Sequence, residues 1–173
     1  MTPSNIDLIT ELYVGYYNRA PDPAGLRFWS KALDEGLSLS AIANEFAKSD
    51  ESQELYPFLA GARSFVVQVY NNVLNRDPDP AGLSFWTEQL LSGTVSPGNF
   101  IVTLEESVRL QVETDDARTL ANKVTVGKRY AERILAADVA FSEPSAHETM
   151  RVITSDPASI ATGEAVITKF IGT

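Results

Sequence analysis

A twelve-residue segment that occurs twice constrains this chain more than any other feature. The segment NRAPDPAGLRFW spans residues 18–29, and NRDPDPAGLSFW spans residues 75–86. The copies differ only at Ala20/Asp77 and Arg27/Ser84. Because proline breaks helices and cannot donate a hydrogen bond to a sheet, neither copy fits inside one unbroken helix or strand. The segment therefore predicts a corner between two elements, built twice.

The residue types of the segment predict how each corner is built. The arginine ends one helix, where a cation suits the negative end of the helix dipole. The first proline stops that helix, the aspartate caps the next helix, and the second proline takes its first position. The glycine leaves room for a neighbouring helix, the tryptophan anchors the core, and the arginine is expected to bond the aspartate across the bend. These structural residues are Arg19, Asp22, Gly25 and Trp29, and Arg76, Asp79, Gly82 and Trp86.

Apolar residues at helical spacing predict that the whole chain is all-α. Two similar helical repeat units are expected at residues 1–62 and 63–112. Residues 113–173 should form a long helix, at about 115–138, and two shorter helices that pack with the repeats into one globular domain. Asp156 and Pro157 are expected to open the last helix, and no segment shows the sustained alternation of a strand.

The second copy partly resembles a calcium-binding loop. Asp77, Asp79, Gly82 and Glu88 fall at positions 1, 3, 6 and 12 of an EF-hand. Position 5 is Ala81, which has no side-chain oxygen, and the first copy begins with Ala20. Helical spacing also continues through the segment. We therefore expect no metal ion at this motif.

The composition excludes several kinds of chemistry. The chain has no cysteine and one histidine, His147, so a site with several histidines or with cysteine ligands is excluded. No G-x-S-x-G motif is present. We expect no catalytic residue, no cofactor and no enzymatic activity, although two carboxylates facing each other across a cleft stay open as an alternative. The net charge of −9 argues against nucleic-acid binding, and no apolar run is long enough to span a bilayer.

The motif, preceded by Tyr13 or Tyr70 and followed in the first copy by AIANEFAKSDE, resembles a bacterial domain-of-unknown-function family. The repeats of that family read L-Y-x-x-x-L-x-R-x-P-D-x-x-G-x-x-x-W, and the likeness covers about residues 6–110. The resemblance implies a module of a large secreted or cell-surface protein, many of which carry RTX-type calcium-binding repeats and leave by type I export without a cleaved signal. This chain has no G-G-x-G-x-D repeat. Composition alone also fits a cytoplasmic protein.

A looser resemblance links the chain to the helical domains that anchor S-layer proteins to lipopolysaccharide. It implies a non-enzymatic attachment module that binds a surface polysaccharide. The alternative is a polypeptide-binding scaffold that assembles a larger extracellular protein, with other copies of the host protein as partners. Titration with polysaccharides and with protein partners would separate the two.

A basic stripe on the predicted long helix is the candidate binding surface for an anionic glycan. Arg118, Arg129 and Arg133 recur on one helix face, together with Asn122 and Thr125. Residues 1–116 carry 17 acidic and 7 basic side chains, so the stripe stands out in an acidic chain. Arginine pairs carboxylate and phosphate groups well. The other interpretation is a solvated helix face with local ion pairs.

Overall fold

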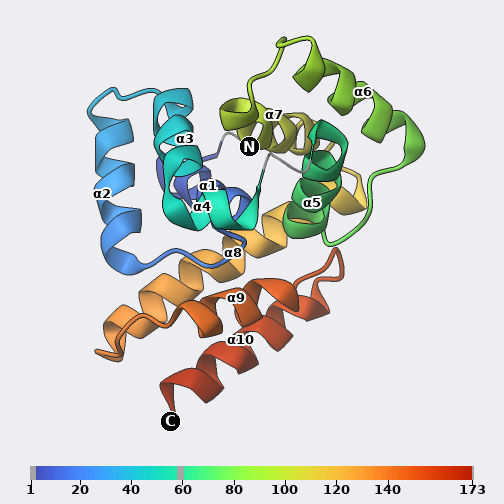
Figure 1. Cartoon of the computed structure of the whole chain (residues 1–173). Coiled ribbons are helices and arrows are strands. Elements are labelled where there is room, and N and C mark those ends of the chain that lie inside the picture. Colours follow the sequence, from blue (N-terminus) through green and yellow to red (C-terminus); the bar gives the residue numbers. More distant parts are fainter. Residues whose placement is uncertain (1–2, 58–60, 173) are drawn as a thin grey trace.

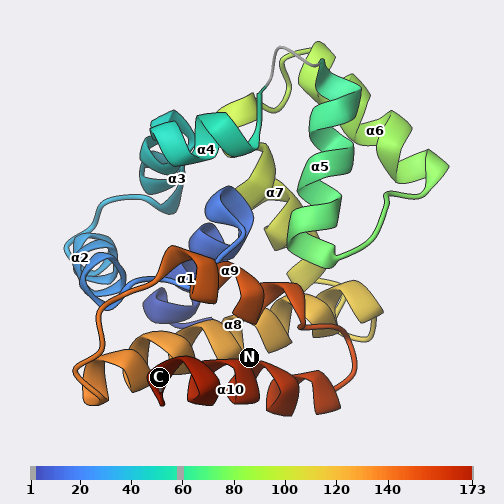
Figure 2. The ribbon, with the colours of Figure 1, turned by 60° about the horizontal axis from the view of Figure 1, so that its bottom comes forward.

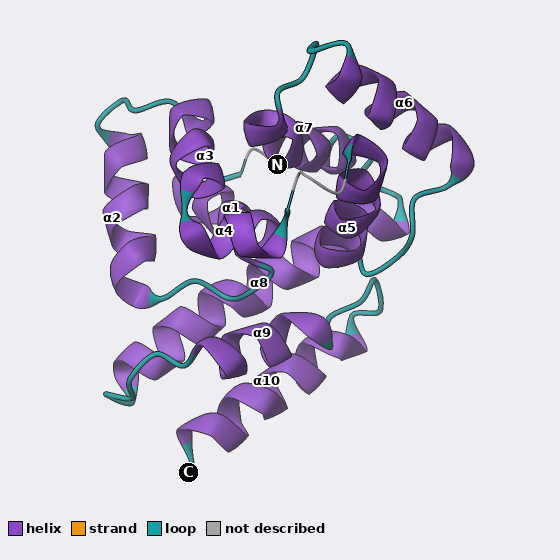
Figure 3. Ribbon diagram, in the orientation of Figure 1, coloured by secondary structure: helices purple, strands orange, loops and turns teal. Residues whose placement is uncertain are grey.

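The structure is a computed structural model that describes residues 3–57 and 61–172 (Figure 1). All regular elements in these residues are α-helices, which confirms the predicted all-α class (Figure 3). In chain order they are α1 (Asn5–Tyr17), α2 (Pro23–Asp34), α3 (Leu39–Lys48), α4 (Asp50–Leu55), α5 (Ala62–Leu74), α6 (Pro80–Leu91), α7 (Pro97–Arg109), α8 (Asp115–Ala136), α9 (Glu143–Arg151) and α10 (Ala158–Ile171).

The order of helices in the first unit recurs in the second. Helix α2 packs against α1 as α6 packs against α5, and α3 and α7 follow at equivalent places and pack against each other. The two units differ at their ends. The first breaks at Ser49 and begins the short helix α4, whereas α7 continues to Arg109.

Local sequence signals set most helix ends. Ser4 and Asp7 form a capping box at the start of α1, and such caps stabilise a helix by about 1 kcal/mol. Gly36 (φ +100°) and Gly93 (φ +73°) follow the ends of α2 and α6, in a conformation that glycine adopts without strain. The asparagine that begins each motif copy ends α1 or α5 in the left-handed region, at φ +49° and +56°.

One apolar core joins the two repeats. Phe46 from α3 and Phe100 from α7 are fully buried in it. The tryptophan of each corner packs on one of them, with ring centroids 5.6 Å apart for Trp29 and Phe46 and 5.3 Å apart for Trp86 and Phe100. The same contact thus closes the core of each unit.

The long helix α8 lies between the repeats and the last two helices in the view of Figure 1. On one side it contacts α1, α2, α5 and α7, and on the other it contacts α9 and α10. A second apolar core forms there around the buried residues Val126, Tyr130, Met150 and Ile167. Among residues 3–57 and 61–172, no helix is both long and apolar enough to cross a membrane.

Candidate functional site

The aspartate of each corner caps the helix that follows it. The Asp22 side chain accepts a hydrogen bond from the backbone N–H of Gly25 (2.7 Å). The Asp79 side chain accepts from Ala81 and Gly82 (3.0 and 2.9 Å). These bonds hold the pKa of Asp79 below its ordinary value. Because α6 begins at Pro80, the residues compared above with a calcium loop are in large part helical.

The glycine of each corner makes room for a tyrosine hydroxyl. A Cβ atom on Gly25 would lie 1.9 Å from the hydroxyl oxygen of Tyr13, which donates to the Asp22 carboxylate (3.2 Å). In the second unit a Cβ on Gly82 would lie 3.2 Å from the hydroxyl of Tyr70. The glycine is therefore needed for the approach of Tyr13 in the first corner, whereas the second corner leaves more room beside Gly82.

We expect Gly25→Ala to lower the free energy of unfolding by up to about 2 kcal/mol. The clash with the buried Tyr13 costs about 1–3 kcal/mol, and the better helix propensity of alanine offsets about 1 kcal/mol. Gly82→Ala, which meets Tyr70 at a longer distance, should be neutral or slightly stabilising. Urea titrations of both variants test this, and equal losses would show that tyrosine approach is not what requires the glycine.

The arginines of the two corners do not bond the aspartates of their own bends, so that expectation is wrong. Arg19 pairs with Glu51 on α4 through two hydrogen bonds (2.6 and 3.0 Å). Its guanidinium also lies over the rings of Tyr13, Tyr17 and Phe141. The bend turns the side chain towards α4, where a carboxylate can receive both of its donor groups.

Arg76 reaches a different partner. It pairs with Asp116 at the start of α8 (2.7 and 2.5 Å) and lies over the Tyr70 ring. Its side chain is 40% exposed, whereas that of Arg19 is 9% exposed. The same motif position therefore connects to two different helices.

The tryptophans of the two corners are buried to different degrees. Trp86 is buried, and its ring N–H donates to the Tyr70 hydroxyl (3.1 Å). Trp29 is only partly buried, although it packs against the same kind of core.

The phenylalanine that precedes each tryptophan faces solvent. Phe28 is 64% exposed and Phe85 is 53% exposed. Each ring packs edge-on against the adjacent tryptophan with centroids 4.9 Å apart. Sequence reasoning did not single out these residues, although phenylalanine at the same position of both copies was the signal that could have found them.

The arginines of the basic stripe on α8 make contacts within the chain, and Arg118 and Arg129 each keep 46% side-chain exposure. Arg129 pairs with Glu164 on α10, and Arg133 donates to the Glu164 carbonyl and the Thr168 hydroxyl (3.3 and 3.0 Å). Arg118 pairs with Asp115 (3.2 Å). Two of the three arginines thus contact α10, because that helix packs along this side of α8.

A group of buried ionisable side chains lies where α1, α7 and α8 meet. Glu105 is 1% exposed, and within the described part of the chain neither of its carboxylate oxygens has a hydrogen-bond partner. Lys123 is fully buried and donates to the Asn72 carbonyl and the Asn75 side chain (2.6 and 2.8 Å).

Burial shifts the pKa values of Glu11, Glu105 and Lys123 from the values that these side chains have in water. It raises the pKa of Glu105 well above the ordinary value, and nearby Glu11 adds to the rise. It raises the pKa of Glu11 to about 7 against the effect of Arg109, which pairs with Glu11 (3.1 Å). It lowers the pKa of Lys123 to about 7, while Glu105 opposes the shift. Such shifts occur in active sites and in structural networks alike.

Two helical corners of one design, joined by a shared core, define a helical repeat module. The chain belongs to the family described as "Domain of unknown function (DUF4214)", since the model of that family matches residues 1–56 and, a second time, residues 59–111. No curated protein and no solved structure matches the chain. The resemblance drawn from the motif is therefore confirmed at the level of the family.

Proposed function

We propose that this chain is a non-enzymatic interaction module of a secreted or cell-surface protein, and that its repeats dock polypeptide segments. The exposed phenylalanine at the same position of both units, Phe28 and Phe85, carries this proposal. The arginine, aspartate and glycine of the corner have contacts within the chain that explain their presence. An exposed phenyl ring offers the fold little, whereas burying it against a partner contributes about 1.5–3 kcal/mol.

The arrangement of the two units supports docking at two points. Helices α2 and α6, which carry the two rings, lie on opposite sides of the repeat pair (Figures 1 and 2). One partner segment can therefore occupy one unit while a second occupies the other. Two linked contacts raise the overall affinity when the geometry lets both form at once.

The charge distribution favours a polypeptide over an anionic polysaccharide. The chain has a net charge of −9, so it repels anionic polymers. The basic stripe was the one surface expected to attract such polymers. Its arginines pair within the chain, namely Arg118, Arg129 and Arg133. A segment with apolar and basic side chains meets both the phenyl rings and the acidic surface, and charge attraction of this kind speeds association.

We expect the variant Phe28→Ser/Phe85→Ser to lose binding but to stay folded. Its melting temperature should fall by about 2–12 °C, because each ring loses an edge-on contact with its tryptophan worth about 0.5–1.5 kcal/mol. The probe is a displayed library of random peptides selected on the immobilised wild-type chain. Selected peptides should carry apolar and basic residues and bind the variant at least about tenfold more weakly. Leu91→Ser, which removes a side chain that is 76% exposed outside the motif, is the matched control.

Two outcomes would contradict the proposal. Peptides that bind the double variant as well as the wild type would remove the phenylalanines from the binding surface. Binding to surface polysaccharides, unchanged in the double variant and with no peptide selected, would favour the glycan-attachment function instead.

A further inference from the structure

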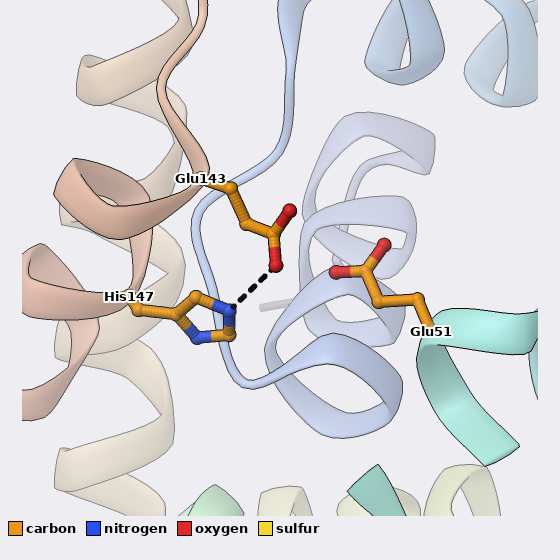
Figure 4. Close-up of side chains that lie close together, drawn as sticks. All are labelled: Glu51, Glu143 and His147. Carbon is orange, nitrogen blue, oxygen red and sulfur yellow. Dashed lines mark ion pairs between the residues drawn. The ribbon is translucent and has the colours of Figure 1, made fainter. Parts of the chain in front are cut away.

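One histidine and two glutamates from distant parts of the chain converge beside the first corner. Glu51 lies on α4, and Glu143 and His147 lie on one face of α9, four residues apart (Figure 4). Each offers one potential ligand atom, and these atoms all lie within 4.8 Å of one another. The three side chains point toward a common centre in Figure 4.

The hydrogen bond of His147 fixes which ring nitrogen faces that centre. Its Nδ1 lies 2.9 Å from the backbone carbonyl of Asn18. A carbonyl can only accept, so Nδ1 carries the proton and donates. In the neutral ring Nε2 then presents a lone pair towards the Glu143 carboxylate, 3.6 Å away. Two acceptors that face each other in this way repel, and a proton on Nε2 or a metal ion between them would turn the repulsion into attraction.

This orientation is the one that metal-binding histidines use. Such a histidine almost always donates its second ring N–H to a carbonyl, a carboxylate or water, which fixes the ring and its tautomer. The bond from His147 to Asn18 supplies that arrangement, and it ties α9 to the residue that begins the first motif copy.

Glu51 is held in place by Arg19. The two hydrogen bonds from the guanidinium occupy both carboxylate oxygens, but an ionised carboxylate has about four acceptor positions, so about two stay free. Two carboxylates and one guanidinium leave the cluster with a negative charge. The cluster therefore attracts a dication, although less strongly than it would without Arg19.

We propose that Glu51, Glu143 and His147 bind a divalent transition-metal ion, with zinc as the best match. One imidazole nitrogen and two carboxylate oxygens are a ligand set that zinc accepts, with water completing its coordination. Zinc–ligand distances of about 2.0–2.2 Å place tetrahedral ligand atoms about 3.4 Å apart. The 3.6 Å between Nε2 of His147 and the Glu143 carboxylate is already close to this distance. Small rotations of the exposed Glu143 side chain would bring the two ligand atoms to it.

The ion would join the first repeat to the C-terminal helices. Glu51 belongs to α4 and the other two ligands belong to α9, so the bound metal would hold together two helices that are distant in the sequence. The site differs from the calcium loop considered above, and it uses a mixed ligand set that the single histidine does not exclude.

The test uses the full chain, treated with a chelator and then titrated with zinc chloride in a calorimeter. We expect one zinc ion per chain, and a melting temperature that rises by about 5 °C or more at about a hundredfold excess over the dissociation constant. Glu143→Gln keeps the size of the side chain but replaces a carboxylate oxygen ligand with an amide. It should weaken zinc binding at least about tenfold, because even the loss of a residue behind the ligands costs a metal site that much.

Glu148→Gln is the matched control, since Glu148 is an exposed acid on the same helix. Cobalt(II) provides a second measurement, because its visible absorption reports coordination by nitrogen and oxygen, and the band should be present in the wild type and Glu148→Gln and absent in Glu143→Gln. No saturable binding of one ion, or equal binding by Glu143→Gln and Glu148→Gln, would overturn the proposal.

Discussion

Replacing Arg19 with alanine is expected to lower the free energy of unfolding by about 2–3 kcal/mol. The side chain is 9% exposed, makes two charged hydrogen bonds to Glu51 and lies over three aromatic rings. Breaking a buried ion pair costs about 3–5 kcal/mol. Water partly offsets that cost here, because the Glu51 side chain keeps 31% of its exposure.

Arg76→Ala is the matched comparison, since it removes the arginine from the same position of the second copy. Its pair with Asp116 is more exposed, at 40% and 21%, and exposed pairs contribute about 0–1 kcal/mol. Urea titrations in the presence of a chelator, so that no metal at Glu51 contributes, measure both variants. Similar losses would show that the aromatic surroundings and burial of Arg19 add nothing to its pair.

The corners and the long helix could be predicted because their causes are local. Proline at the first turn, aspartate before it and glycine after the helix act within a few residues of their own position. Helix α8 spans residues 115–136 where about 115–138 was expected, and Asp138 then turns the chain at φ +54°. Signals of this kind are present in a short stretch of sequence and do not depend on how helices pack.

The partners of the arginines could not be predicted, because they depend on packing between distant helices. Arg19 was expected to bond the aspartate three residues away, but the bend directs it to α4. The stripe of Arg129 and Arg133 was identified correctly as one face of a helix. Nothing in that periodicity shows that α10 covers it, because the position of α10 is set by the apolar core around Tyr130 and Ile167.

The proposed metal ligands were beyond sequence reasoning for a related reason. Glu51 and His147 lie in separate units, and no local spacing joins them. The buried group of Glu11, Glu105 and Lys123 is similar, since its members come from three helices. An acid inside an apolar helix face was visible at Glu105, yet only the packed structure shows that the side chain is removed from water.

The buried group predicts that stability falls as the pH rises from about 5 to about 7. Burial raises the pKa of Glu11 from 4.5 to about 7, and it raises that of Glu105 as well. A raised carboxyl pKa means that the folded chain holds the proton more tightly. Its contribution is complete below the unfolded pKa and is lost as the pH rises through the folded pKa. Over this window the free energy of unfolding should fall by about 2–3 kcal/mol for each carboxyl group that keeps its proton in the folded chain.

Lys123 changes the stability in the opposite direction with pH, and it does so over a different pH range. Its pKa falls from 10.5 to about 7, so its contribution is present above the unfolded value and is lost as the pH falls through about 7. The two effects together place a minimum of stability close to pH 7. Urea titrations at intervals from pH 5 to pH 9 measure the profile, and a flat or rising curve between pH 5 and pH 7 would contradict the assignment.

Glu105→Gln tests which side chain is responsible. The amide cannot ionise, so the variant should lose much of the slope between pH 5 and pH 7. It should also be more stable than the wild type at pH 8 by about 1–3 kcal/mol, because a neutral amide avoids the cost of ionising a buried acid. Glu106→Gln removes the next acid along α7, which is exposed, and should leave the profile close to that of the wild type. If both variants keep the full slope of stability against pH, the proton that the folded chain retains is not on Glu105. Substitutions of Glu11 and Arg109 would then be tested next.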